Sequence, residues 1–389
     1  MSKRKESQRA RRVKKDWTKG NRGRLSRLDA IGGKEEDFDA LTGGRESMRP
    51  RGVTIDELRD VEALPRGEVV RTQSGTYDVA LEGSDRIVSC RVKRGASTEN
   101  PQATIVVIGD VVRITMMEGG HGLIQHVEER HGIIGRAGTG AHRGGQQVIA
   151  ANVDMILCVV SAERDNIRPS LIDRFIVGAL LGEVEPVVVV NKIDTADEQF
   201  IEAIAETLEI YPQLGYQVLF TSATTGYGLE ELVAACAGQT CAIIGQSGVG
   251  KSTLVNAVLG REEREVGEVR ASDRRGRHTT VGSQILEMEG GGRLIDTPGL
   301  REFGIWDLDP QELDGYFVEF ADYHQKCKYL PCTHTHEPGC AVQAAVAEGR
   351  LAAERYTAYR KLAEELAEIE RRQIERGRAE KSRPPPRRR

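Results

Sequence analysis

The sequence predicts a multidomain protein in which a small N-terminal β-barrel is followed by an α/β domain on a parallel sheet and then by a smaller helical domain. Three observations predict this order. Short, alternating, β-branched segments separated by glycines fill residues 67–128. From Val153 onwards, continuous apolar segments alternate with amphipathic ones, as in a parallel sheet covered by helices. Finally, three cysteines and two histidines lie together in residues 327–340.

The composition is that of a globular chain without membrane segments. Of its 389 residues, 39% are hydrophobic and 29% are charged. No apolar run approaches the roughly 20 residues that span a bilayer. The charged N-terminus has no apolar stretch behind it, so it does not resemble a secretory signal. We therefore expect a cytoplasmic location and no membrane partner, and nothing in the sequence requires more than a monomer.

The two ends of the chain are strongly basic. Residues 1–27 carry a net charge of +10 and residues 371–389 carry +7. Because the whole chain carries −4, the segment between them carries −21. Such tails often contact the phosphate backbone of nucleic acid, although solvated, disordered ends have the same composition. Residues 1–60 are predicted to be a basic, mostly disordered tail, and residues 371–389 a second basic tail.

Residues 61–137 are predicted to form an OB-type barrel. The segments "GEVVRTQSGTYDVAL", "RIVSCRVKR", "ATIVVIGDVVRITMM" and "HGLIQHVEER" alternate apolar and polar residues, with turns between them. An OB-type barrel suits this length and would bind an oligonucleotide on one face. The alternative, a generic small β domain, has the same strand pattern.

Residues 138–312 are predicted to form an α/β domain with a parallel sheet. Its buried strands are expected in "VDMILCVVSA", "PVVVVNKID", "QVLFTSA" and "TCAIIG", with helical patterns between them. The last of these strands runs into "GQSGVGKS", Gly245–Ser252, which fits the phosphate-binding P-loop and opens a helix. Backbone N–H groups of this loop and Lys251 would hold the phosphates, and Ser252 would hold Mg²⁺. The residues predicted to bind nucleotide here are Gly245, Gln246, Ser247, Gly248, Val249, Gly250, Lys251, Ser252 and Thr253.

"NKID" and "TSA" indicate a guanine pocket. Asn191 and Asp194 would bond the guanine edge, and Lys192 would pack over the base. A carboxylate accepts from the N1–H and amino group of guanine, which adenine cannot offer, so the predicted nucleotide is GTP or GDP rather than ATP. The backbone of Ser222 and Ala223 would read the guanine oxygen.

Two further segments have the character of GTPase switches. In "DTPG", Asp296 is predicted to hold Mg²⁺ and Gly299 to turn its N–H toward the γ-phosphate. In "RHTT", Thr280 is preferred over Thr279 as the residue that closes over Mg²⁺.

The order of these elements is reversed relative to an ordinary GTPase, because the guanine reader precedes the phosphate loop. When the natural termini of a domain lie close together, they can be joined and the chain opened at another loop without changing the site. The α/β domain is therefore predicted to be a circularly permuted α/β P-loop GTPase domain.

Residues 313–370 are predicted to be a zinc-binding and helical domain. "CKYLPCTHTHEPGC" provides Cys327, Cys332, His334 and Cys340, the number of ligands for one closed, structural Zn²⁺ site per chain, with His336 as the alternative to His334. The other cysteines are expected to be core residues; they are Cys90, Cys158, Cys236 and Cys241.

Together, the permuted order and the segments "GQSGVGKS", "GRHTT", "DTPGLREFG", "QQVIAANVD" and "CKYLPCTHTHEPGCAV" resemble the small ribosomal subunit biogenesis GTPase family, RsgA, over residues 67–345. The resemblance implies an OB barrel, a permuted GTPase domain and a zinc domain. It also implies binding to the 30S subunit and its 16S rRNA late in maturation, with subunit-stimulated GTP hydrolysis followed by release.

The residue after DTPG is Leu300, where many GTPases have a water-orienting Gln. His278 is therefore the candidate for catalytic help, beside Lys251 and Thr280. Two other functions fit the sequence. One is a GTP-regulated RNA-binding scaffold with negligible turnover, and the other is a GTPase that acts on another RNA or on a protein.

Overall fold

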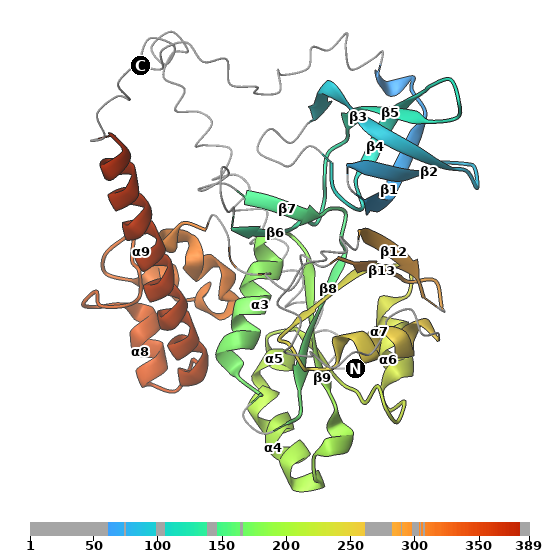
Figure 1. Cartoon of the computed structure of the whole chain (residues 1–389). Helices are drawn as coiled ribbons and strands as arrows, with labels where there is room; N and C mark the ends of the chain where they lie inside the picture. Colours follow the sequence, from blue (N-terminus) through green and yellow to red (C-terminus); the bar gives the residue numbers. More distant parts are fainter. Residues whose placement is uncertain are drawn as a thin grey trace.

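One long β-sheet runs through two of the three parts of the molecule (Figure 1). In the computed structural model its strand order is β10-β9-β8-β11-β13-β12-β1-β2-β3-β5-β4. The structure describes residues 61–73, 75–98, 106–137, 146–163, 166–260, 282–288, 290–297, 303, 305 and 308–381. The predicted N-terminal tail, residues 1–60, lies outside these ranges.

The described strands are β1 Arg66–Gln73, β2 Thr76–Leu81, β3 Ile87–Thr98, β4 Val111–Met116, β5 Gly122–Val127, β6 Ile134–Ala137, β7 Gln146–Ala150, β8 Met155–Ser161, β9 Glu185–Asn191, β10 Gln217–Phe220, β11 Thr240–Gly245, β12 Ser283–Glu287 and β13 Arg293–Asp296. The described helices are α3 Pro169–Leu181, α4 Glu198–Leu208, α5 Ile210–Gln213, α6 Leu229–Cys236, α7 Lys251–Leu259, α8 Ala341–Ala347 and α9 Ala353–Lys381. Short 3₁₀ turns are η3 Ile193–Thr195, η5 Pro310–Tyr316, η6 Val318–Phe320 and η7 His324–Lys326.

The first domain is a closed, five-stranded OB barrel, as the sequence predicts. Its strands pair in the order β1-β2-β3-β5-β4, and β4 returns to β1 to close the barrel. All of these pairs are antiparallel except β3 with β5. Alternate residues face inward because side chains of a strand point to opposite faces. Val69, Val79 and Ile124 are therefore fully buried, whereas Arg91 and Lys93 on β3 are exposed.

The second domain has the predicted parallel sheet. Strands β10, β9, β8, β11 and β13 are parallel, and β12 is added antiparallel at the edge. Both faces of β9 are buried because its valines alternate between two cores. Val188 and Val190 pack with α3, α4 and α5, while Val187 and Val189 lie in the core that contains α6 and α7.

A hairpin of β6 and β7 lies beside α3, where the chain passes from the barrel to the parallel sheet (Figure 1). It is antiparallel, and Ala150 at its end forms a bridge with Ile108 of the barrel domain. Beyond the hairpin, strand β1 pairs directly with β12 through Arg71↔Gln284 and Thr72↔Ser283. The barrel is thus joined to the edge of the GTPase sheet by backbone hydrogen bonds.

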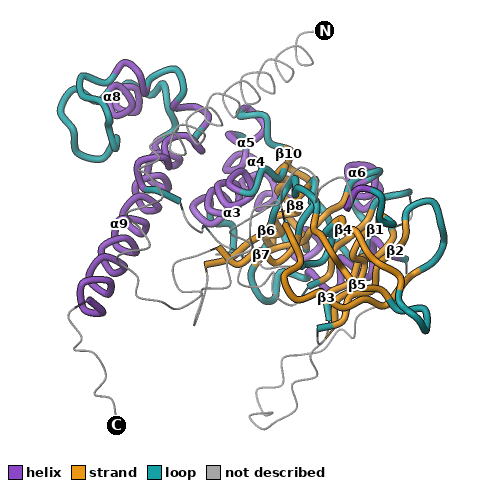
Figure 2. The backbone as a smooth tube through the Cα atoms, turned by 90° about the horizontal axis from the view of Figure 1, so that it is seen from above, coloured by secondary structure: helices purple, strands orange, loops and turns teal. Residues whose placement is uncertain are grey.

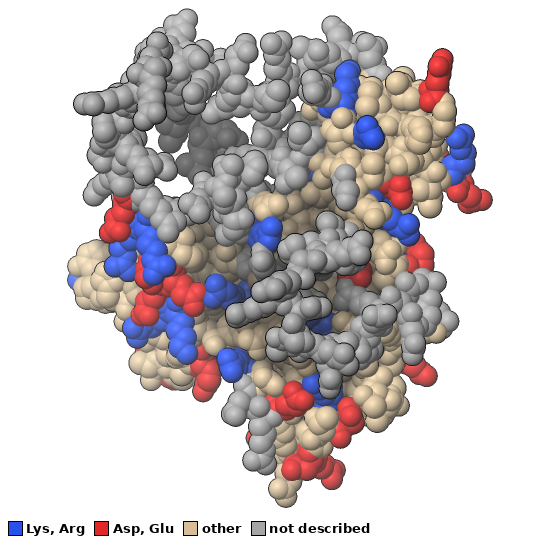
Figure 3. Space-filling view, viewed as in Figure 1, with Lys and Arg blue, Asp and Glu red and all other residues tan. Residues whose placement is uncertain are grey.

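The C-terminal domain packs against α3, on the side away from the barrel in both views (Figures 1 and 2). Its core contains Phe317 and Phe320, whose rings are stacked, and Tyr359, which makes edge contacts with both. Helix α9 continues to Lys381 and so includes part of the segment predicted as a basic tail. Acidic and basic side chains are interleaved along its exposed face (Figure 3), with i,i+4 pairs at Arg360–Glu364 and Arg372–Glu368.

A buried ion network fastens this domain to α3. The Arg355 guanidinium on α9 donates to Asp173 of α3, and its Nε donates to Glu319 of η6 at 2.7 Å. Asp173 also accepts from the hydroxyl of Tyr211 at 2.8 Å. Burial raises the pKa of Asp173, while Arg355 opposes that rise. The network joins α3, α5, η6 and α9 around one guanidinium.

Candidate functional site

The phosphate loop joins the buried strand β11 to α7, as its sequence predicts. Gly248 and Gly250 have φ values of 88° and 90°, a left-handed region that glycine enters at little cost. A glycine loop with this backbone conformation at the N-terminus of a helix is the arrangement that presents successive N–H groups to an anion. Lys251 is folded over the loop, where its Nζ donates to the carbonyls of Gly245 at 2.9 Å and Gln246 at 2.6 Å.

Asn191 brings the guanine reader and the phosphate loop together. It is the last residue of β9 and is buried. Its Nδ2 donates to the carbonyl of Val249 in the phosphate loop at 3.0 Å, across 58 positions of sequence. Its Oδ1 accepts from the backbone N–H of Ala223 at 3.3 Å and from the hydroxyl of Thr221 at 3.3 Å. One amide therefore joins the NKID, TSA and phosphate-loop segments.

Lys192 and Asp194 follow at the same edge of the sheet. Lys192 has a left-handed backbone, with φ of 64° and ψ of 35°, and it caps the turn η3. A Cβ on Gly250 would lie only 2.5 Å from Asn191 Nδ2 and 3.5 Å from Lys192 Cε. Asp194 is exposed, and its Oδ1 accepts from the hydroxyl of Ser222 at 2.5 Å. That bond orients the carboxylate and leaves lone pairs for a base edge.

The DTPG segment begins at the end of β13. Since β13 is parallel to β11, Asp296 lies at the same sheet edge as the phosphate loop. The neighbouring Thr297 is buried, and its hydroxyl accepts from Ser283 at 2.7 Å, which ties the ends of β12 and β13 together. The other predicted switch and catalytic residues lie outside the described residues; they are His278, Thr279, Thr280, Gly299 and Leu300.

The residues present fit a guanine nucleotide with Mg²⁺. The amide of Asn191 bonds the phosphate loop, and a Cβ at Gly250 would collide with it. Asn191 and Asp194 are both hydrogen-bonded to the TSA segment. Ser252 in the first turn of α7 and Asp296 have the oxygen donors that Mg²⁺ prefers. When bound, the ion would neutralise phosphate charge. Gln246, Ser247 and Thr253 lie in the loop and first helical turn, as the motif requires.

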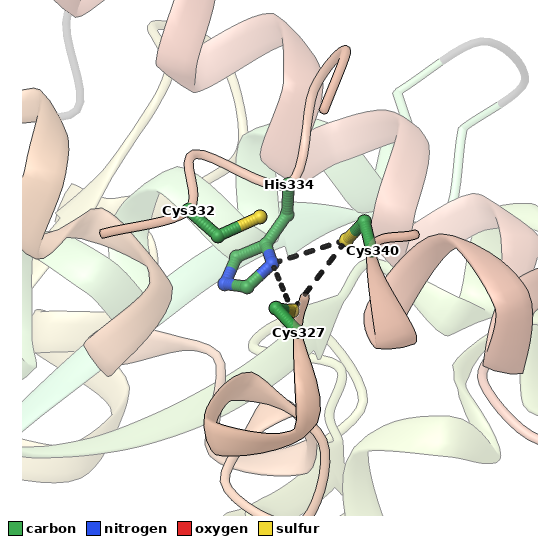
Figure 4. A group of neighbouring side chains, drawn as sticks. All are labelled: Cys327, Cys332, His334 and Cys340. Carbon is green, nitrogen blue, oxygen red and sulfur yellow. Dashed lines mark hydrogen bonds between the residues drawn. The ribbon is translucent and has the colours of Figure 1, made fainter. Parts of the chain in front are cut away.

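The four predicted zinc ligands converge in the C-terminal domain (Figure 4). One ligand atom from each of Cys327, Cys332, His334 and Cys340 lies within 4.8 Å of the others. The Cys327 and Cys340 sulfurs are 3.9 Å apart, and His334 Nδ1 is 3.6 Å and 3.3 Å from them. A tetrahedral ion with Zn–S of about 2.3 Å and Zn–N of about 2.1 Å would separate these atoms by about 3.8 and 3.6 Å.

The surroundings of His334 also suit a structural metal. His334 is fully buried, and its Nε2 lies 3.4 Å from Oδ2 of Asp314, so Nδ1 remains for the ion. The alternative ligand His336 is exposed and contacts the hydroxyl of Thr335. Two tyrosines of α9 hold the ligand loop, because Tyr356 donates to the carbonyl of His334 and Tyr359 to that of Thr333.

Sequence reasoning missed the supporting residues of both sites. The Val249 carbonyl and the Thr221 hydroxyl hold Asn191, and Asp314 contacts His334. Thr221 belongs to the TSA segment, so the sequence could have indicated that it supports the guanine pocket. Asp314 lies 20 positions before His334, outside any motif spacing that identifies it.

Comparisons with known proteins show the family of the chain. The family model described as RsgA GTPase matches residues 127–306. A small ribosomal subunit biogenesis GTPase RsgA of Chlorobaculum parvum is 38% identical over 309 residues, covering 78% of this chain and 98% of the relative. The protein of the same name from Haemophilus influenzae is 36% identical over 306 residues, covering 78% of this chain and 85% of its own.

Solved structures show the same architecture. The crystal structure of YjeQ from Thermotoga maritima is similar with a TM-score of 0.62 and 33% identity, covering 78% of this chain and 98% of that one. The structure of YloQ, described as a circularly permuted GTPase, has a TM-score of 0.61 and 26% identity, covering 79% and 97%.

The fold and the nucleotide site therefore define a circularly permuted P-loop GTPase with an N-terminal OB barrel and a C-terminal Cys/His cluster. It is an enzyme that hydrolyses GTP. With relatives of 36–38% identity over 85–98% of their length, the chain belongs to the RsgA family of GTPases. Among the described residues, no helix combines the length and apolarity needed to cross a membrane.

Proposed function

We propose that this chain is a GTP-hydrolysing assembly factor that binds the 30S ribosomal subunit late in its maturation, contacts 16S rRNA and leaves after hydrolysis. It acts as a monomer in the cytoplasm, with GTP or GDP and Mg²⁺ in the permuted domain and one Zn²⁺ in the C-terminal domain. The observation that carries the nucleotide assignment is the bond from Asn191 to Val249, because it joins the guanine reader to the phosphate loop.

The roles of the nucleotide-site residues follow from their positions. Asn191 and Asp194 select guanine, and Lys192 covers the base. Lys251, now bonded to two loop carbonyls, exchanges these bonds for phosphate oxygens when GTP enters. Because Leu300 cannot orient water, His278 assists hydrolysis. We expect slow turnover by the free protein and faster hydrolysis when the subunit places His278 beside the attacking water.

Three features support a ribosomal RNA partner. The curated relatives are named for small-subunit biogenesis. The OB barrel has exposed Arg91 and Lys93 on β3, a strand face of the kind that binds oligonucleotides. The two basic ends, at +10 and +7, add phosphate-binding charge to an otherwise acidic chain.

A route from the switches to the barrel supports release after hydrolysis. Strand β12 directly follows the segment with His278 and Thr280, and it pairs with β1 of the barrel. Arg293 at the start of β13 also donates to Glu68 of β1 at 2.6 Å. A change in the switches at the γ-phosphate therefore has a short backbone path to an RNA-binding surface.

Guanine selection is tested by Asp194→Asn. The amide donates where the carboxylate accepted, so it should bind xanthine, whose 2-oxo group accepts, in place of guanine. We expect GTP affinity to fall at least tenfold and XTP affinity to rise, measured by isothermal titration. An equal loss of affinity for GTP and XTP, or an unchanged affinity for GTP, would contradict the assigned pocket.

The partner is tested by co-sedimentation with purified 30S and 50S particles in GTP, GDP and a non-hydrolysable GTP analogue. We expect retention on 30S particles with the analogue and a steep decrease of binding with salt. GTPase rates with and without 30S separate the alternatives. Stimulation supports the assembly GTPase, whereas nucleotide-dependent binding with negligible turnover supports an RNA-binding scaffold. Absence of 30S binding would direct the search to another RNA or to a protein.

A further inference from the structure

The ammonium of Lys192, the middle residue of the guanine reader, is held by a carboxylate from a neighbouring strand. Its Nζ lies 3.0 Å from Oε1 of Glu163. Glu163 stands two residues after the end of β8, and β8 is paired with β9 along its length. The hydrogen bond from Lys192 lowers the pKa of Glu163, so the carboxylate is charged at neutral pH.

Glu163 is itself fixed by three polar contacts. Its Oε2 accepts from the hydroxyl of Ser161 at 3.0 Å and from Nδ2 of Asn166 at 3.2 Å. Its backbone N–H donates to Ser161 Oγ at 3.3 Å. The two strand tips are joined by a further bond from Ala162 N to the carbonyl of Asn191 at 2.8 Å. The carboxylate is therefore placed by the strand tip that also holds the guanine reader.

Lys192 is consequently constrained at both ends. At the backbone, its left-handed conformation sets the direction in which the side chain leaves. At the other end Glu163 holds the ammonium, while Cε passes 3.5 Å from where a Cβ of Gly250 would lie. The aliphatic stem thus runs beside the phosphate loop at the junction with the base pocket.

We propose that Glu163 is a positioning residue of the guanine pocket, which holds the Lys192 ammonium so that its stem covers one face of the bound purine. The proposal rests on the proposed guanine-nucleotide function. Glu163 need not touch the nucleotide. Without it, Lys192 gains rotamer freedom in the free and bound protein, and the base loses a preformed wall, so the nucleotide leaves faster.

The test is a double-mutant cycle on the full-length protein with a fluorescent GDP analogue, measured by stopped flow. Because the Glu163 and Lys192 side chains are 44% and 28% exposed, the effect of Glu163→Gln should be modest. We expect a dissociation rate about two- to fivefold faster, the range of an exposed ion pair, with a nearly unchanged association rate. Glu163→Asp, which keeps the charge, should recover part of the loss.

The cycle is closed with Lys192→Ala. In that background Glu163→Gln should change the dissociation rate by less than about 1.5-fold, because the carboxylate has lost the group it positions. Glu202→Gln, at an exposed position of α4, is the control for the change in net charge. Thermal melts of the nucleotide-free variants should agree with the wild type.

Two results would overturn the proposal. One is an unchanged dissociation rate for Glu163→Gln. The other is the same change with and without Lys192, which would mean that Glu163 acts on the fold or on the nucleotide directly. Failure of the wild-type protein to prefer guanine nucleotides over adenine nucleotides would instead remove the proposed function, and it is measured separately by competition of unlabelled GDP or ADP with the fluorescent analogue.

Discussion

Replacing Arg355 with methionine should undock the C-terminal domain from the GTPase sheet. The guanidinium serves two carboxylates, with Asp173 fully buried and Glu319 at 9% side-chain exposure. Removing one partner of a buried ion pair costs about 3–5 kcal/mol, because the remaining charge is left without compensation. For a cooperative unit of about 150–250 residues this lowers the melting temperature by roughly 6–20 °C. Circular dichroism of the zinc-loaded protein measures the change.

The loss should depend on pH with a definite sign. Burial already raises the pKa of Asp173, and removing Arg355 raises it further. A carboxyl whose pKa is raised by folding stabilises the fold while it is protonated and loses that contribution as pH rises through its folded pKa. Arg355→Met should therefore be more destabilising near about pH 8 than near about pH 5.

The matched control is Arg360→Met on the same helix. Arg360 is 51% exposed and pairs with Glu364 at 3.4 Å, so its loss should cost less than about 0.5 kcal/mol. A melting temperature for Arg355→Met within a degree or so of the Arg360→Met value would show that the buried guanidinium does not fasten the domain.

Both sites should also respond to single changes. Gly250→Ala and Gly248→Ala both force alanine to a positive φ, but only the first also meets Asn191 Nδ2 at 2.5 Å. We therefore expect Gly250→Ala to weaken GDP binding at least tenfold more than Gly248→Ala does, as measured by titration calorimetry. Equal losses of affinity in the two variants would contradict the contact with Asn191. Metal analysis should find one zinc ion per chain. Removing the ion with a chelator should lower the melting temperature without abolishing GDP binding. An unchanged melting temperature after verified loss of zinc would exclude a structural ion. His278→Ala should reduce 30S-stimulated hydrolysis about 10²-fold or more with unchanged GTP affinity, and unaltered hydrolysis would remove His278 as the candidate.

Much of the architecture could be predicted because its signals are local. The four valines of β9 are buried on both faces and end in a polar tip, as a parallel strand requires. The glycines of the phosphate loop have the positive φ values that their motif needs. Cys327 and Cys340 meet because both belong to one short loop, so their spacing already limits where they can lie.

The contacts between domains could not be predicted, because they join segments far apart in sequence. Arg355 lies in a helix rich in charged residues, where it resembles any solvated arginine, yet it is 2% exposed and binds a carboxylate 182 positions earlier. The pairing of β1 with β12 depends on strand register, which the alternating pattern of either strand alone does not fix. Glu163 carries no motif, and its role depends on its distance to Lys192.

The position of β11 in the sheet has a consequence for biosynthesis. It lies between β8 and β13, although β8, β9 and β10 all leave the ribosome before it. A nascent chain that ends before residue 240 therefore contains the NKID and TSA segments but lacks the phosphate-binding loop. One edge of its strand β8 is still without a neighbouring strand. Ligand cannot stabilise that intermediate. Synthesis of this short strand, followed by the loop and helix α7, is the step at which β8 gains its second neighbour and the chain first becomes able to retain a nucleotide.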